Sequence, residues 1–218
     1  MRNPAGLFIT FEGTEGAGKS TLIREVAAQL CRHFKCKITL SREPGGNKVA
    51  ERIRAVILEE PMDPWTELFL YEAARAEHVA KTIRPALKRG EIVLCDRYAD
   101  SSLAYQAHAR GLPWNKVDAL NQTATQGLKP HLTVMLDIDP ALGLKRAREH
   151  TRFEAEGVKF QTKVRQGFLK ARSREPGRWL VLKVESKTPQ ELAEKVVAAV
   201  ARKFARRLRK KVTKKVKR

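Results

Sequence analysis

The sequence predicts an α/β fold in which a five-stranded, mostly parallel sheet is flanked by helices. Five short apolar runs alternate with segments of helical periodicity, a pattern typical of strands joined by crossover helices. A glycine-rich stretch lies directly between the first apolar run and the first helical segment. Neither a fixed-period repeat nor a low-complexity linker interrupts residues 1–205, so we expect one domain there.

Each expected strand is a short apolar run that ends in polar or turn-forming residues. In chain order the runs are LFITFE (7–12), KITLS (37–41), EIVLCD (91–96), LTVMLDI (132–138) and WLVLKV (179–184). The second run is ended by REPGG, because its proline and glycines favour a turn. Runs this apolar are expected to be covered by helices on both faces of the sheet.

The helical segments carry apolar residues three and four positions apart. The expected helices cover residues 19–34, 48–58, 65–88, 101–109, 114–127, a segment after Pro140, residues 153–174 and a last segment from residue 189. Thr188 is the expected N-cap of the last helix, because a side-chain hydroxyl there can accept a hydrogen bond from a free backbone N–H group.

Composition limits the class of protein. Apolar residues make up 42% of the chain and charged residues 31%, and no apolar run approaches the roughly 18 residues of a membrane span. The first residues lack the features of a signal peptide. Cys31, Cys36 and Cys95 form no CxxC pair, which argues against a disulfide framework or a zinc site. We therefore expect a cytoplasmic protein without a membrane span.

The net charge of +20 is unevenly distributed. Residues 202–218 hold 11 Lys and Arg and no acidic residue, and the rest of the chain has 33 basic and 24 acidic residues. Residues 206–218 are therefore expected to form a basic C-terminal tail outside the domain. Its apolar residues recur every four positions, so it is either a solvated continuation of the last helix or a non-specific contact surface for nucleic acid or an anionic membrane.

The segment from Gly13 to Ser20 matches the pattern G-x-x-x-x-G-K-[ST] between a strand and a helix. Glycines let backbone N–H groups surround a phosphate, and the helix N-terminus adds its positive dipole end. The expected nucleoside triphosphate contacts are Gly13, Thr14, Glu15, Gly16, Ala17, Gly18, Lys19, Ser20 and Thr21. Lys19 is expected at the β- and γ-phosphates and Ser20 at Mg²⁺. The competing interpretation is a glycine-rich turn, and the motif alone does not separate ATPases, GTPases and kinases.

Three further clusters bear on what receives the phosphate. Arg42 lies in SREPGG after the second strand, and Asp96 and Arg97 lie in CDRYADSSLAYQ at the end of the third. These positions share the sheet edge at which parallel folds bind ligands, where an arginine can grip a phosphate with two N–H groups. Tyr71 and Arg75 are four residues apart and share one helix face.

Simpler roles compete for several of these positions. Tyr71 and Phe69 could both be core residues of an amphipathic helix, and we favour that role for Phe69. Arg75 could be a solvated surface charge or a partner of Glu72. Asp96 and Arg97 could form a structural ion pair. Ser101 is expected to be structural, as a helix N-cap.

These blocks, in this order, resemble bacterial thymidylate kinases (dTMP kinases), a family of P-loop nucleoside monophosphate kinases, from residue 7 to about residue 204. REPGG and DRYADSSLAYQ carry the resemblance most specifically. It implies a P-loop kinase fold, a homodimer, and transfer of the γ-phosphate of Mg²⁺-bound ATP to dTMP, giving dTDP and ADP. The competing hypotheses are a kinase for another nucleotide or a deoxynucleoside, and a non-catalytic P-loop protein that binds nucleotides or nucleic acid.

The resemblance also implies the acceptor contacts. Arg42 and Arg97 would hold the monophosphate, and Glu15 would contact the 3′-hydroxyl of the sugar. Tyr71 would stack on thymine, at a position where the family usually has Phe. The remaining expected contacts are Arg75 and Ser102 at the base edge, Tyr105 under the deoxyribose, where it disfavours a ribose, and Gln106 beside it. Pro44 falls where the family can carry a cis peptide bond.

By the same resemblance, Lys19, Asp96 and Arg97 are catalytic, and Ser20 and Asp96 are the Mg²⁺ ligands. Phosphoryl transfer between two anions also calls for a further cation near the transferred group.

Bacterial members whose loop lacks an arginine usually supply one from a lid that resembles RGGxDRFExE. Here Gly16 occupies the loop position, and the lid, RAREHTRFEAEG (146–157), is shorter and has Thr151 in place of the aspartate. Arg152 matches the lid arginine, and Arg148 is its stand-in if the shorter lid shifts register. The competing interpretation is that both belong to a charged helical surface.

Overall fold

Five parallel strands form one sheet at the centre of the molecule. The structure, a computed structural model, describes residues 6–147 and 152–215, with side chains up to residue 204. The strands are β1 (Leu7–Glu12), β2 (Ile38–Arg42), β3 (Ile92–Asp96), β4 (Leu132–Asp137) and β5 (Trp179–Lys183), in the spatial order β2-β3-β1-β4-β5. Every neighbouring pair is parallel. The predicted sheet is confirmed, and each strand begins and ends within one residue of its predicted bounds.

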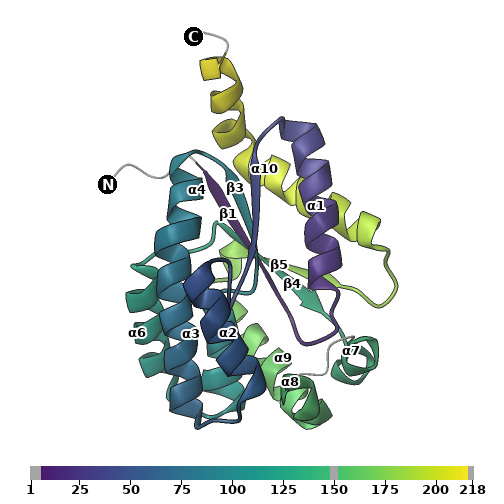
Figure 1. Cartoon of the computed structure of the whole chain (residues 1–218). Helices are drawn as coiled ribbons and strands as arrows, with labels where there is room; N and C mark the ends of the chain where they lie inside the picture. Colours follow the sequence, from purple (N-terminus) through teal and green to yellow (C-terminus); the bar gives the residue numbers. More distant parts are fainter. Residues whose placement is uncertain (1–5, 148–151, 216–218) are drawn as a thin grey trace.

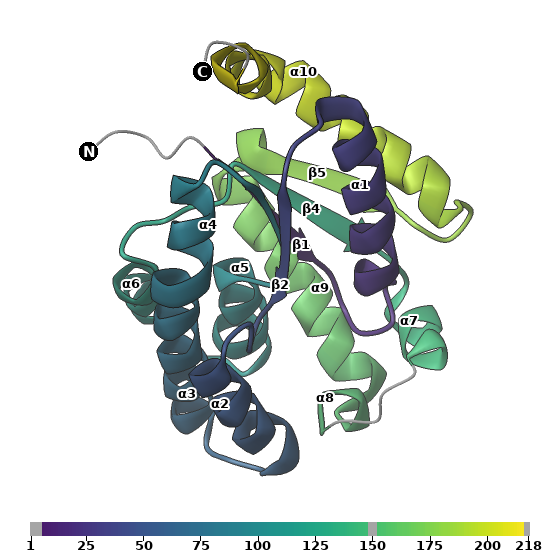
Figure 2. The same cartoon turned by 45° about the horizontal axis from the view of Figure 1, so that its top comes forward.

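Helices cover both faces of this sheet. Figures 1 and 2 show α1 (Lys19–Phe34) and α10 (Pro189–Lys215) together on one face, and α3 (Pro64–His78), α6 (Trp114–Thr125) and α9 (Gly157–Arg174) on the other. The shorter elements are α2 (Lys48–Glu59), η1 (Val79–Ile83), α4 (Arg84–Lys88), α5 (Ala99–Ser102), η2 (Leu103–Ala109), α7 (Pro140–Arg146), α8 (Arg152–Ala155) and η3 (Pro176–Arg178).

The two-sided cover explains why β1 is buried along its whole length. Ile9 belongs to the core cluster that includes Leu22 of α1 and Val196 of α10. Phe8, its neighbour in the chain, packs in the opposite cluster with Ile83 and Tyr98. Successive side chains of a strand point to opposite faces, so both sets are buried only when both faces are covered.

Three predicted helices are subdivided. The helix predicted over residues 65–88 is α3, the π-helical turn η1 and α4, and the one predicted over residues 101–109 is α5 followed by the π-helical η2. The helix predicted from residue 153 is divided at Gly157, whose φ of +75° interrupts the helical path. As a result α8, the short helix of the predicted lid, is separate from the long helix α9.

The last helix begins with a capping box. The hydroxyl of Thr188 accepts a hydrogen bond from the backbone N–H of Glu191 (3.2 Å), and the Glu191 carboxylate accepts one from the N–H of Thr188 (2.7 Å). The predicted N-cap is therefore confirmed. The helix continues to Lys215, through the predicted boundary between residues 205 and 206, and that division of the chain stays a prediction. Within the described residues, no helix combines the length and apolarity that a membrane span requires.

The strand register brings the predicted motifs to one edge. Asp96 at the end of β3 is the Cα partner of both Phe11 in β1 and Arg42 in β2, so the three strands end at one level. The glycine-rich loop, REPGG and the segment from Arg97 onward therefore leave the sheet side by side, as the parallel arrangement predicts.

Candidate active site

The glycine-rich loop forms a compact turn between β1 and α1. Lys19 is the first residue of α1, and its ammonium donates hydrogen bonds to the carbonyls of Gly13 (3.2 Å) and Thr14 (3.0 Å). The side chain is buried, and this burial, followed by the nearby charge of Arg97, lowers the pKa of Lys19. A buried cation held only by carbonyls is a strong site for an anion, which is the property that a phosphate cradle needs.

Ser20 and Asp96 meet beside this loop. The Ser20 hydroxyl, in the first turn of α1, donates a hydrogen bond of 2.8 Å to Oδ2 of Asp96 at the end of β3. A hydroxyl and a carboxylate are the hard oxygen ligands that Mg²⁺ takes together with phosphate oxygens. The two predicted metal ligands are therefore adjacent and chemically suited to that ion.

Arg97 bridges the loop and the neighbouring pocket. Its backbone N–H donates to the carbonyl of Phe11 (2.9 Å), and its φ of +67° turns the chain sharply at the end of β3. One guanidinium nitrogen donates to the carbonyl of Gly13 (3.0 Å), and another donates to Oε1 of Glu15 (2.6 Å). Asp96 and Arg97 thus have separate partners and do not form an ion pair with each other.

Glu15 collects donors from two elements. Its Oε1 accepts from Arg97 and from the Tyr105 hydroxyl (2.7 Å), while the Arg97 guanidinium lies 4.9 Å from the Tyr105 ring centroid. Burial alone raises the pKa of Glu15, but the charges of Arg97 and Lys19 outweigh it and hold that pKa at about 2. Glu15 is therefore an anion at neutral pH. It joins the phosphate loop to η2, the segment that holds Tyr105.

Glu12, the residue before the loop, organises the start of α5 from inside the core. Its carboxylate accepts hydrogen bonds from the backbone N–H of Tyr98 (2.9 Å) and from the hydroxyl of Ser101 (2.6 Å). Ser101 lies within α5 and not at its N-cap, so the predicted cap role is wrong. Its hydroxyl instead connects Glu12 to Arg97, which donates to it over 3.4 Å.

Replacing Glu12 with Gln is expected to remove a pH dependence of stability. Burial, and then the charge of Asp100, raises the pKa of Glu12 to about 8 from its ordinary value of 4.5. Between these values the folded protein holds a proton that the unfolded chain has lost, so this stabilisation is complete below pH 4.5 and is lost as pH rises through 8. The free energy of unfolding of the wild type should fall relative to E12Q by at most about 1.4 kcal/mol per pH unit. Urea unfolding of both proteins from pH 5 to 8 measures the difference between their free energies of unfolding. A difference that does not change with pH would contradict the raised pKa of Glu12.

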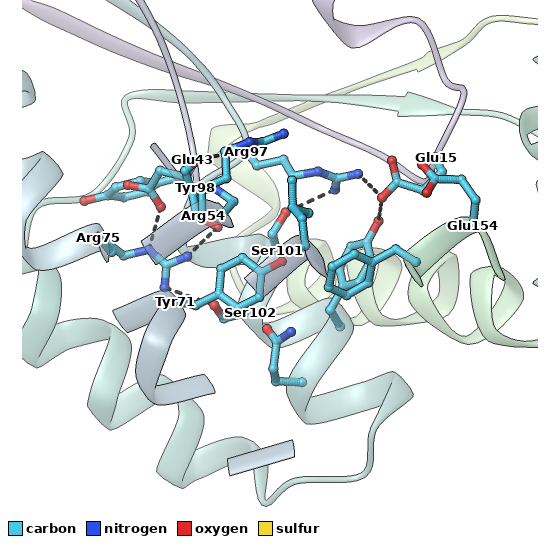
Figure 3. Close-up of a pocket in the computed structure, with 15 residues that line it drawn as sticks. Glu15, Glu43, Arg54, Tyr71, Arg75, Arg97, Tyr98, Ser101, Ser102 and Glu154 are labelled. Atoms are coloured by element: carbon cyan, nitrogen blue, oxygen red, sulfur yellow. Dashed lines mark hydrogen bonds and ion pairs between the residues drawn. The ribbon is translucent and has the colours of Figure 1, made fainter. Parts of the chain in front are cut away.

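A pocket opens beside Glu15 and Arg97 (Figure 3). It encloses about 590 Å³, counting the solvent at its mouth, and Figure 3 shows Tyr71 and Arg75 on one side and Glu15 and Glu154 on the other. Its lining residues are Glu15, Glu43, Pro44, Arg54, Leu58, Tyr71, Arg75, Arg97, Tyr98, Ser101, Ser102, Tyr105, Gln106, Phe153 and Glu154. Seven of the eight predicted acceptor contacts, all except Arg42, therefore line one cavity.

Arg75 is the most completely held of these side chains. It is buried and donates to the carboxylates of Glu43 (2.8 Å) and Glu72 (2.5 Å) and to Asn121 (2.7 Å). It also donates to Ser102 (3.0 Å) and to the backbone carbonyl of residue 98 (3.3 Å). A guanidinium has five N–H groups, one on Nε and two on each Nη. Nε donates to Glu43, Nη1 serves the three side chains of Glu72, Ser102 and Asn121, and Nη2 donates one N–H to the carbonyl. The second N–H of Nη2 remains for a ligand. The competing role as a solvated charge is wrong, whereas the pairing with Glu72 is confirmed.

Aromatic rings also shape the pocket. The Tyr105 ring contacts Phe153, Phe160 and Phe168 edge to face, with centroids 5.9 to 6.2 Å apart. Tyr71 lines the same cavity, and its ring centroid lies 6.5 Å from that of Phe153. Phe69, for which we favoured a core position, is 55% exposed, and its ring lies tilted beside that of Trp65, with centroids 6.0 Å apart. That interpretation is therefore wrong.

Two arginines of the REPGG region differ from expectation. Arg42 does not line the pocket; its exposed side chain pairs with Glu51 at 2.9 Å. Arg54, in α2, does line it and donates to the carbonyl of Pro44 (3.0 Å). Sequence reasoning missed Arg54 because a helical arginine among other charges has no local mark that distinguishes it. The peptide bond before Pro44 is cis, as the resemblance implied.

The described part of the predicted lid, α8, lies against the pocket. Arg152, the first residue of α8, donates through Nε to the carbonyl of Ile57 (2.6 Å) and pairs through Nη1 with Glu67 (2.6 Å). Phe153 and Glu154, which sequence reasoning did not single out, line the pocket. Arg148 lies outside the described residues.

Known proteins are similar to this chain over most of its length. A family model described as thymidylate kinase matches residues 11–196. The thymidylate kinase of Pelobacter propionicus is 44% identical over 207 residues, which cover 89% of this chain and 94% of that protein. The thymidylate kinase of Deinococcus radiodurans is 47% identical over 201 residues, which cover 90% of this chain and 97% of that protein. The chain belongs to the thymidylate kinase family.

A solved member of the thymidylate kinase family has the same fold. The crystal structure of thymidylate kinase from Ehrlichia chaffeensis matches with a TM-score of 0.76 and 30% sequence identity, and the match covers 90% of this chain and 100% of that one. The P-loop kinase fold and the family that the motifs predicted are thus confirmed. The phosphate loop and the pocket-lining residues from Glu15 to Glu154 all lie within residues 11–196, which the family model matches.

Proposed function

We infer that the site performs the reaction of its family, in which the γ-phosphate of ATP is transferred to dTMP to give dTDP and ADP. The observation that supports this best is the contact of Glu15, Arg97 and Tyr105. It places the wall of the acceptor pocket within two hydrogen bonds of the loop that would hold the donor phosphates. A nucleoside monophosphate kinase needs this proximity, because two nucleotides must meet in one site.

We propose an in-line transfer with little covalent work for the protein. A phosphate oxygen of dTMP attacks the γ-phosphorus of ATP, and the bond to the bridging oxygen breaks, so that oxygen leaves with ADP. The attacking oxygen is already anionic, so no general base is needed. The protein must instead offset repulsion between two anions. The buried Lys19 and the partly buried Arg97 are the cations that donate hydrogen bonds to the loop carbonyls.

Ser20 and Asp96 are the proposed ligands of Mg²⁺. When bound, the ion would supply positive charge that offsets part of the negative charge on the donor phosphates. The hydrogen bond between these two side chains supports the assignment, because it keeps a hydroxyl and a carboxylate beside the first turn of α1.

The acceptor is proposed to enter the pocket with its base toward Arg75 and its sugar toward Tyr105. Tyr71 would stack on thymine, while Ser102 and the remaining N–H of Arg75 would meet the base edge, with Gln106 beside them. Glu15 would accept a hydrogen bond from the 3′-hydroxyl. Arg97, supported by Arg54 from the pocket wall and by Arg42 from the end of β2, would hold the monophosphate.

Arg152 and Arg148 are the proposed lid arginines. Arg152 uses Nε and Nη1 for contacts with the protein, and its buried Nη2 has no hydrogen-bond partner among the described residues. That nitrogen is the part of the side chain left for a phosphate oxygen. Arg148 keeps its role as the stand-in.

An acceptor panel tests the function. The full chain is incubated with ATP and Mg²⁺ and, separately, with dTMP, dUMP, UMP, dCMP, dGMP and thymidine, and ADP formation is measured. We expect dTMP to be converted with the highest kcat/KM and UMP to be poor, because Tyr105 closes the space for a 2′-hydroxyl. Preferential conversion of another acceptor would replace the assignment. No conversion of dTMP at all would favour the non-catalytic hypothesis.

We also propose a cytoplasmic homodimer with a basic tail that contacts anionic surfaces. Val49 and Val56 in α2 and Phe69 in α3 are exposed apolar side chains on two helices that pack together, which supports a subunit interface there. The charge of residues 206–218 supports salt-sensitive, sequence-independent binding of nucleic acid or an anionic membrane.

A further inference from the structure

We propose that Glu67 is a positioning residue that fastens the predicted lid helix α8 to the acceptor pocket. Glu67 lies in the first turn of α3 and is 0% exposed. It does not line the pocket, so any effect on dTMP must pass through the side chains that it holds. The inference rests on the proposed assignment of the pocket to dTMP.

The carboxylate of Glu67 receives donors from two segments far apart in the chain. Gln106, in η2, donates to Oε1 over 2.7 Å. Arg110, directly after η2, donates to both oxygens at 3.2 and 3.3 Å. Arg152 of α8 pairs with Oε2 at 2.6 Å. One side chain of α3 therefore ties η2 and α8 to the same point.

Because the Glu67 carboxylate is buried, separating it from its arginine partners is energetically costly. A fully buried carboxylate pays a large desolvation cost unless cations and hydrogen bonds surround it, and here two guanidinium groups do so. Releasing Arg152 would leave the carboxylate with less compensating charge. The second contact of Arg152, with the carbonyl of Ile57 in α2, holds the same guanidinium from the other side. The start of α8 is therefore docked on both α2 and α3.

The docked helix supplies a wall of the acceptor pocket. Phe153 follows Arg152, is buried, and contacts Tyr105 edge to face at 5.9 Å. It lies 6.5 Å from Tyr71, so it stands between the ring proposed for the base and the ring proposed for the sugar. Gln106 is the other pocket residue that Glu67 holds. The hydrogen bond from its amide nitrogen to Glu67 fixes the orientation of the amide. Two parts of the wall thus depend on one carboxylate outside the pocket.

Glu67→Gln tests the proposal with little change in side-chain volume. The substitution removes the charge that pairs with Arg152 and presents an amide N–H to guanidinium groups that need acceptors. We expect the KM for dTMP to rise at least roughly tenfold, while the KM for ATP changes less than twofold. Glu91→Gln is the matched control, because Glu91 is also mostly buried and pairs with Arg89 (2.8 Å), and this pair precedes β3 at the other edge of the sheet. E91Q should leave both KM values unchanged.

A double-mutant cycle separates positioning from a purely structural role. If Glu67 acts through Arg152, Arg152→Met should raise the KM for dTMP by a similar factor, and E67Q combined with R152M should do no more than the stronger single variant. Phe153→Ala should reproduce the rise in KM, and Phe153→Leu should partly restore the wild-type value. Independent, multiplying effects of E67Q and R152M would overturn the proposal. So would an E67Q enzyme with a lowered thermal midpoint and an unchanged KM for dTMP.

The readouts distinguish this proposal from the proposed function. Turnover of dTMP by the wild type reports on the reaction, whatever the variants do. If E67Q does not fold well enough for kinetics, R152M and F153A remain measurable, and a KM for dTMP unchanged in both would overturn the docking role.

Discussion

Replacing Lys19 with methionine is expected to lower kcat roughly 10³-fold while leaving the protein at least as stable as the wild type. The ammonium is buried against the carbonyls of Gly13 and Thr14, and its proposed work is to stabilise charge on the transferred phosphate. Methionine keeps the length and apolar stem of lysine and removes the charge. Because burial, and then Arg97, lowers the pKa of Lys19, the charged form is unfavourable in the folded protein, and removing it should not destabilise the fold.

The measurement pairs steady-state kinetics with thermal unfolding. Lys88→Met serves as the control, because Lys88 is exposed on α4, whose end contacts the start of β1 and not the phosphate loop. K88M should match the wild type in kcat and in thermal midpoint. If K19M loses activity and also unfolds at a much lower temperature, the buried ammonium is part of the structural framework. That result would contradict the proposal that Lys19 serves catalysis and not stability.

The fold and the phosphate loop could be predicted from the sequence because their signals are local. An apolar strand followed by glycines and a lysine predicts the phosphate loop from neighbouring residues alone. The ends of β2 and β3 were equally predictable, because parallel strands finish at one edge and their following residues must lie there. Asp96 and Arg97 could therefore be placed at the site from the sequence, and the structure has Ser20 next to Asp96.

The contacts that shape the pocket could not be predicted this way. Arg54 reaches it only because α2 packs on α3, and its position in the sequence resembles that of any surface arginine. Tyr71 and Phe69 are two residues apart in a helix with apolar residues on several faces, so periodicity does not tell which ring is covered. The Glu67 cluster joins residues 67, 106, 110 and 152, and no local pattern relates them. Tertiary packing decides these positions.

Gly16→Arg, which introduces the loop arginine that the resemblance implies for other family members, is expected to lower both stability and activity in this chain. Gly16 has a φ of +69°, and a Cβ there would lie 1.8 Å from the carbonyl oxygen of Gly143 in α7. The contact is reciprocal, because a Cβ on Gly143 would lie 2.6 Å from the carbonyl oxygen of Glu15. The loop and α7 therefore meet backbone to backbone, and any side chain at position 16 must move one of them.

Gly127→Ala isolates the clash from the backbone strain. Gly127 has the same φ of +69°, yet a Cβ there would meet nothing within 4 Å, so G127A should cost only the left-handed conformation, about 1–2 kcal/mol. Gly16→Ala and G16R should each cost more than that in urea unfolding and should weaken ATP binding, because the N–H groups that surround the phosphates would shift. A G16R enzyme as stable as G127A, with a raised kcat, would show that α7 yields to the side chain. If G16R and G16A are equally impaired, the Cβ is the cause, and a cation for the transferred phosphate must come from outside the loop. The close contact of Gly16 with Gly143 would then explain why this chain must take that cation from its lid.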